Sequence, residues 1–206
     1  MPTENRATIS EPEALAALTH PVRLDLLTHL MAAGPATASQ CARAVGDTPS
    51  NCSYHLRVLA RHGLVGADES ADARERPWRA LVTGFSVDGF QDEPGSAKAK
   101  GAAALLALSV QRDQRLVRDY LANRDRIPKR WRQADGYSTY TLRMTPAELT
   151  SLGSQLDALI RPYLAATRED AVLGAELVHL GLSAFVLPHV PSTSDSAAAG
   201  SASVTS

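Results

Sequence analysis

Apolar residues in the first part of the chain recur at the spacing of amphipathic helices. The pattern predicts a short helix at about Pro12–Leu18, then a longer one that starts at Pro21 and stops at Gly34. A third helix is expected after Thr37, because Thr37 and Gln40 have the spacing of a capping box. The chain therefore opens as a helical unit.

The stretch TPSNCSYHLRVLARHGLV, residues 48–65, predicts a fourth helix with two different faces. Thr48 is a favourable N-cap, and a proline follows it at the first helical position. Cys52, Leu56 and Leu59 fall at i, i+4 and i+7 and should point inward. A short turn at Gly46 joins the third and fourth helices, which is the helix-turn-helix pattern.

After Gly63 the helical spacing gives way to short extended runs. The segments LVGA, at residues 64–67, and PWRALV, at residues 77–82, flank a polar stretch and predict a β-hairpin, which would form a wing on the helical unit. Trp78 is expected in the core at the base of this wing. Residues 86–96 are rich in Gly, Pro and acidic residues and predict a linker.

The second half of the chain mixes both periodicities. A long helix is expected over about 97–126. Residues 137–144 and 176–188 alternate apolar and polar side chains as strands do, and a capping box at Thr145 opens another helix over about 146–163. We expect the two strands to pair, with this helix laid across them.

These elements predict a mainly α protein with a small β component: a winged helix-turn-helix domain followed by a C-terminal α/β dimerisation region. The expected organisation is a flexible tail at 1–10, a winged helix-turn-helix DNA-binding domain at 11–85, a linker at 86–96, a helical and α/β dimerisation or effector region at 97–190, and a disordered tail at 191–206.

Composition limits the partners and the cellular location that we expect for the protein. The 206 residues carry a net charge of −1, although residues 98–132 hold ten Lys and Arg against three Asp, a face that could meet an anionic partner or simply be solvated. Because no apolar run reaches membrane-spanning length and the N-terminus lacks signal-peptide features, we expect a cytoplasmic protein with no membrane partner. Two cysteines cannot form a disulfide framework.

Three segments carry a family resemblance: ALTHPVRLDLLTHL, TPSNCSYHLRVLARHGLV and RERPWRA. Together, over roughly residues 11–85, they resemble the ArsR-type winged helix-turn-helix transcriptional regulators. The resemblance implies a bacterial, dimeric DNA-binding protein whose fourth helix reads the DNA. Many members of this family sense metals, so metal ligands have to be sought as well.

A recognition helix enters the major groove near its N-terminus. Short polar side chains there can bond to base edges, and arginines further along can bond to phosphates. Arginines on a wing can enter a minor groove or bind phosphate, although a solvated turn is an alternative for them. The candidate DNA-binding residues are Thr48, Ser50, Asn51, Ser53, Tyr54, Arg57, Arg61, Arg74, Arg76 and Arg79.

Metal and catalytic chemistry have little support in the sequence. The third helix has a single cysteine, Cys41, and Cys52 occupies a core position, whereas a thiolate metal site needs more ligands. We favour two buried small residues over a thiol switch, and we expect His20, His29 and His55 to be structural. Since no phosphate loop, catalytic carboxylate pair or nucleophile elbow occurs, we expect no metal, no cofactor and no enzymatic activity.

Two functions stay open. The first is a sequence-specific regulator, with repression as the expected sign, that binds a palindromic operator as a homodimer formed through the 97–126 helix and the N-terminal helices. The second is a winged-helix protein-interaction module without DNA binding, which the eight Arg and ten acidic residues of residues 1–90 would suit. A small-molecule effector would extend the first function, in a pocket near Trp131, Tyr140 and Phe185, although a scaffold without a ligand is equally compatible.

Overall fold

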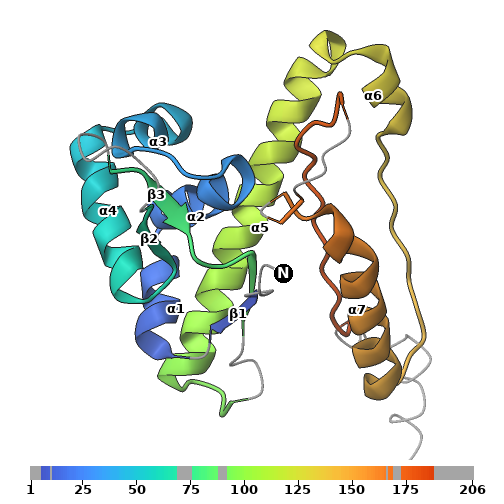
Figure 1. The fold of residues 1–206 in the computed structure, drawn as a ribbon. Coiled ribbons are helices and arrows are strands. Elements are labelled where there is room, and N and C mark those ends of the chain that lie inside the picture. Colours follow the sequence, from blue (N-terminus) through green and yellow to red (C-terminus); the bar gives the residue numbers. More distant parts are fainter. Residues whose placement is uncertain are drawn as a thin grey trace, which may run out of the picture.

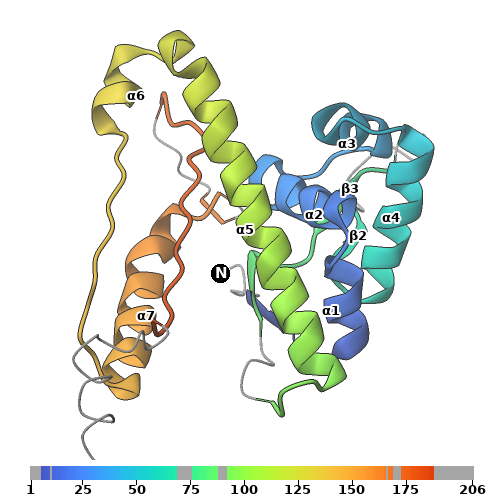
Figure 2. The same ribbon diagram turned by 180° about the vertical axis from the view of Figure 1, so that it is seen from behind.

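The structure is a computed structural model, and it describes residues 6–9, 11–68, 76–87, 92–165, 167–168 and 173–187. Figures 1 and 2 show the short helices and strands of the N-terminal part gathered on one side of a long helix, with the last long helix on its other side. The helices are α1 (Pro12–Leu18), α2 (Pro21–Ala33), α3 (Ala38–Val45), α4 (Pro49–Arg61), α5 (Ala97–Asn123), α6 (Lys129–Ala134) and α7 (Pro146–Ile160).

Helices α1 to α4 form where the apolar pattern predicted them, and their ends follow local chemistry. The expected capping box opens α3, with the Thr37 hydroxyl accepting from the Gln40 N–H and the Gln40 side chain accepting from the Thr37 N–H. The Thr48 hydroxyl caps α4 by accepting from the Asn51 N–H. Gly46 adopts a left-handed conformation, φ 71°, which ends α3 and turns the chain into α4.

The predicted wing is confirmed in its two strands. β2 (Val65–Ala67) pairs antiparallel with β3 (Trp78–Ala80), with Val65 opposite Ala80. Trp78 also exchanges backbone hydrogen bonds of 2.8 and 2.9 Å with Ala36, and its half-buried ring packs on the hydrophobic core, as expected for the wing base. The hairpin is thus fixed to the segment that leads into α3.

The N-terminus differs from the prediction. Residues 6–9 form strand β1 (Arg6–Ile9), which pairs in parallel with β4 (Gly84–Val87), and only 4% of Ile9 is exposed. The prediction of a flexible tail at 1–10 is therefore wrong for residues 6–9, and that of a linker at 86–96 is wrong at its start; residues 1–5 and 10 lie outside the described residues. A four-residue strand has almost no periodicity, and its partner lies far along the chain, so local patterning could not reveal it.

The hydrophobic core joins the helix-turn-helix unit to α5. Leu15 and Leu18 of α1, with Leu26 and Leu27 of α2, are fully buried and form one cluster with the inward face of α4. Leu105 of α5 is also fully buried in this cluster. The first half of α5 is therefore part of the N-terminal core, and only its second half extends beyond it (Figures 1 and 2).

An ion-pair cluster fixes α5 further along. Asp25 of α2 accepts from Arg112 Nε at 3.1 Å and from Arg115 Nη2 at 2.8 Å. The Asp25 and Arg112 side chains are about three-quarters buried by neighbouring atoms, so this pair is screened less than a surface ion pair. These contacts tie the basic part of α5 to the same helix that supports α4.

The expected strands of the C-terminal half are not formed. The capping box of Thr145 and Glu148 opens α7 as predicted, and the helix continues into a 3-10 turn (Arg161–Tyr163), as α5 does at Arg124–Arg126. Residues 137–144 and 175–187 are extended, but neither belongs to a described sheet, and their side chains are exposed. The predicted β-α-β unit is therefore wrong for the single chain, since α7 lies between the two segments in both views (Figures 1 and 2).

Leu105→Ala should destabilise the N-terminal unit by roughly 2–4 kcal/mol, because it leaves a cavity in a core that α5 helps to close. Chemical denaturation followed by circular dichroism measures the loss. Gln114→Ala, at an exposed position of the same helix, is the matched control and should change stability little. A loss for Leu105→Ala as small as the control's would show that α5 is not part of this core.

Candidate nucleic-acid interface

Helix α4 has one buried and one exposed face. Cys52, Leu56 and Leu59 are fully buried against the core. The opposite face begins at the N-cap and runs to the last turn, and it presents the exposed side chains of Thr48, Ser50, Tyr54, Arg57 and Arg61. Tyr54 is 60% exposed, which is unusual for a large ring and leaves it free to contact a ligand.

Two of the predicted contact residues, Asn51 and Ser53, are half-buried. The Asn51 amide donates to Asp47 Oδ2 at 2.6 Å, and the Asn51 backbone N–H donates to the Thr48 hydroxyl at 3.2 Å. In this arrangement one hydrogen of the Asn51 amide is engaged by Asp47, and the side-chain oxygen and the second amide hydrogen are left to meet a base. Asn51 is thus held in one orientation before any DNA arrives.

Asp47 is a site residue that the sequence analysis missed. Its other carboxylate oxygen accepts from the Thr48 N–H at 2.6 Å. The hydrogen bonds from Thr48 and Asn51, with a smaller contribution from His55 and His20, lower the pKa of Asp47 below its usual value. A carboxylate at a helix N-terminus is favourable for folding, yet it places a negative charge on a surface expected to meet phosphates. The Asp-Thr-Pro start of the helix was the signal that could have identified it.

A pair of histidines connects α4 with the start of α2. His55 is 6% exposed, and its ring centroid lies 4.4 Å from that of His20, which precedes α2. Burial is the main cause that lowers the pKa of both imidazoles, and Arg23 and the charge on the other histidine add to it for His55. Each Nδ1 is buried without a hydrogen-bond partner among the described residues. The structural role expected for His20 and His55 fits this packing.

The wing contributes two described arginines. Arg76 precedes β3, Arg79 lies within it, and both side chains are exposed. Arg74 lies outside the described residues. DNA contact by the wing therefore stays a prediction. Among the described residues it concerns Arg76 and Arg79, which lie before and within the strand that Trp78 anchors.

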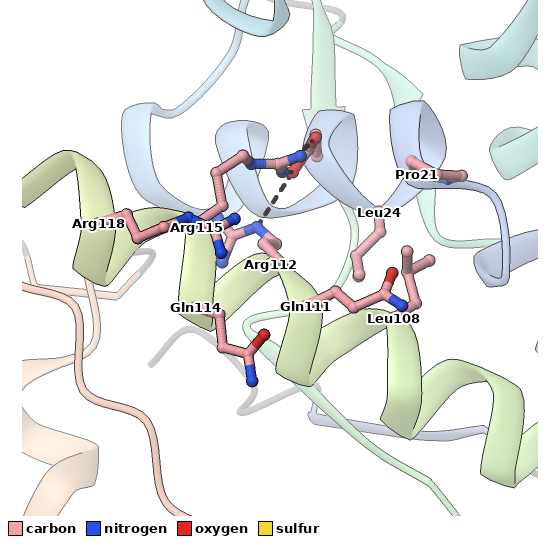
Figure 3. Close-up of a pocket in the computed structure, with 9 residues that line it drawn as sticks. Pro21, Leu24, Leu108, Gln111, Arg112, Gln114, Arg115 and Arg118 are labelled. Carbon is pink, nitrogen blue, oxygen red and sulfur yellow. Dashed lines mark hydrogen bonds and ion pairs between the residues drawn. The ribbon is translucent and has the colours of Figure 1, made fainter.

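A groove lies between α2 and α5 (Figure 3). It is lined by Pro21, Leu24, Leu108 and the arginines around Asp25. The effector pocket predicted near Trp131, Tyr140 and Phe185 is not enclosed, since Tyr140 is 78% and Phe185 71% exposed. That expectation is wrong for the single chain, because the strands that would have closed the pocket do not form.

Both cysteines are fully buried and free. Burial raises the pKa of Cys41 to about 11 and also raises that of Cys52, so neither is a ready thiolate at neutral pH. Within the described residues, no three His, Cys, Asp or Glu side chains are close enough to hold a metal ion. The buried positions of Cys41 and Cys52 fit the interpretation of both as small core residues.

Residues 18–65 match a family model described as a helix-turn-helix domain. The match runs from the end of α1 through α2, α3 and α4 to the first residue of β2, less than half of the chain. No curated protein matches the chain. The region that contains α4 is therefore similar to helix-turn-helix domains, a class that suggests a DNA-binding regulator. Among the described residues, no helix is both long and apolar enough to cross a membrane.

The histidine pair should make folding stability depend on pH. Because the folded pKa values are lowered, the unfolded chain binds more protons below its ordinary histidine pKa of about 6.5, and stability is lost as the pH falls through that value. Thermal unfolding at about pH 7.5 and about pH 5.5 should show a smaller loss on acidification for His55→Phe than for the natural chain. His29→Gln, on α2 outside the pair, is the control; an equal loss in all three chains would remove this role from the pair.

Proposed function

We propose that this protein is a dimeric, sequence-specific transcriptional regulator of the ArsR type that binds double-stranded DNA. The observation that carries the proposal is the division of α4 into a fully buried apolar face and an exposed face of short polar and arginine side chains. A helix held in this way by a helix-turn-helix unit can enter a major groove without unfolding.

Roles within the interface follow from side-chain length. Ser50 and Ser53 are short enough to let the backbone of α4 approach base edges, and the oriented Asn51 oxygen can accept from a base amino group. Arg57 and Arg61 lie one and two turns further along, where a phosphate backbone borders the groove. Arg76 and Arg79 would bind the neighbouring backbone or minor groove.

The protein would bind a palindromic site as a dimer, since one helix-turn-helix unit reads only a few base pairs. Repression is the simplest outcome of occupying such a site near a promoter. A small-molecule effector would act through the α2–α5 groove, because Asp25, Arg112 and Arg115 there link α5 to the helix that supports α4.

A protein-interaction module is the second candidate, favoured by the acidic excess of residues 1–90 and by the carboxylate of Asp47 at the start of α4. Gel shifts with DNA from the gene's own upstream region separate the two functions. A regulator forms a complex that prefers this DNA over unrelated sequence, with affinity falling between about 50 mM and about 200 mM salt. An interaction module gives no such complex at either concentration.

Arg57→Ala should weaken binding to all sequences alike and lower the salt dependence by about one phosphate contact. Fluorescence anisotropy with operator and unrelated DNA at several salt concentrations measures both quantities. Arg161→Ala, on an exposed arginine far along the chain, should leave both unchanged. A loss confined to one base position would move Arg57 from phosphate contact to base reading.

Asp47→Ala and Asn51→Ala should each relax base preference by roughly 1–3 kcal/mol. Asn51→Ala removes the amide, and Asp47→Ala removes the carboxylate that orients it. The two effects should not add in the double variant, since both act through the same hydrogen bond. Asp47→Ala should also raise affinity for unrelated DNA by removing a negative charge. Additive losses in a competition assay with single-base operator variants would mean that Asp47 does not act by orienting Asn51.

A further inference from the structure

The C-terminal half has two extended segments that lack strand partners. Residues 137–144 and 175–187 make no backbone hydrogen bond with another described residue, and neither belongs to the sheets formed by β1–β4 and β2–β3. The second segment lies between α5 and α7, where His179 Nε2 is 3.2 Å from Asp113 Oδ1 of α5. The first runs along the outer side of α7 (Figures 1 and 2).

Both segments expose a row of apolar side chains with the period of a strand. Tyr140, Leu142 and Met144 share one face of the first segment. The second segment has the same spacing, and its row consists of Val178, Leu180, Leu182, Ala184 and Val186. Alternation of this kind is typical of strands with one buried face. Each segment is therefore expected to pair with a neighbouring strand that its own chain does not supply.

The exposed apolar surface is large enough for a stable interface. Eleven large apolar side chains of the two segments are exposed. At roughly 100 Å² each, they present about 1,100 Å² per chain, more than the roughly 800 Å² that each partner gives to a typical stable complex. The largest apolar patches of monomeric proteins are about 300–600 Å².

We infer that a second copy of this chain covers the surface by reciprocal strand exchange: residues 137–144 of each copy pair with residues 175–187 of the other. The inference rests on the dimer of the proposed function and states how it is built. A two-fold arrangement supplies both missing neighbours at once, because the same two segments are present on each copy. Val110, Val117 and Leu121 of α5 are exposed as well.

The proposed pairing is antiparallel. An antiparallel register that sets Tyr140 opposite Leu180 and Leu142 opposite Val178 places the two apolar rows on one face of the strand pair, with Arg143 opposite Leu177 on the other face.

Cross-linking between two differently tagged full-length chains tests the exchange. One chain carries Thr139→Cys and the other Ser183→Cys, both at exposed positions that the proposed register places diagonally on one face. After co-expression, a short bifunctional maleimide should give a covalent heterodimer in the mixture and none with either chain alone. The natural chain, whose two thiols are buried, is the control for background labelling.

A chain carrying both cysteines distinguishes the alternatives. Links between chains support the exchange, whereas links only within a chain, or links between two Ser183→Cys chains, overturn it. As an independent readout, Leu180→Arg with Leu182→Arg should turn the dimer into a monomer by light scattering while the far-ultraviolet spectrum stays helical. Ser154→Arg, on exposed α7, should remain dimeric; dimers from both variants would also overturn the exchange.

DNA binding is measured separately, so that the two proposals can fail independently. If the natural chain shifts its upstream DNA as a dimer but no interchain link forms, the strand exchange is wrong and the regulator stands. If the links form but no preferred DNA complex appears, the exchange stands and the proposed function is wrong.

Discussion

The burial of one side of α4 is the constraint on which the rest of the structure depends. Cys52, Leu56 and Leu59 have no exposed surface, so the helix can neither rotate nor slide without opening the core. At roughly 1.5–3 kcal/mol for each fully buried aliphatic side chain, this face fixes which residues of α4 point outward. The anchored wing and the Asp25 ion pairs hold the surrounding elements in place around that helix.

Most of the N-terminal half could be predicted from the sequence, because its helices follow local patterns. Helix ends there depend on neighbours in the sequence, as the capping box of Thr37 and Gln40 and the left-handed Gly46 show, so pattern and composition suffice. Strand β1 could not be predicted, because its four residues pair with β4 across a long stretch of chain. Asp47 was missed for a related reason: its effect on Asn51 is visible only once the turn places the two side chains together.

The C-terminal half shows the limit of reading a single chain. The alternating segments at 137–144 and 175–187 predicted strands, yet a strand is stable only with a partner, and α7 separates the two segments within one copy. Local periodicity specifies that a segment should pair but does not specify with which chain. In the strand-exchange arrangement the same pattern would stabilise a dimer and position two copies of α4 on one DNA.

The central claim is that two copies of α4 read one DNA site, and footprinting of the gene's upstream region with the full chain tests it most directly. The account predicts protection of two related half-sites in opposite orientation, with centres about one helical turn, or about 10 base pairs, or a multiple of it apart. A single protected half-site, or no protection at protein concentrations that saturate a gel shift, would contradict it.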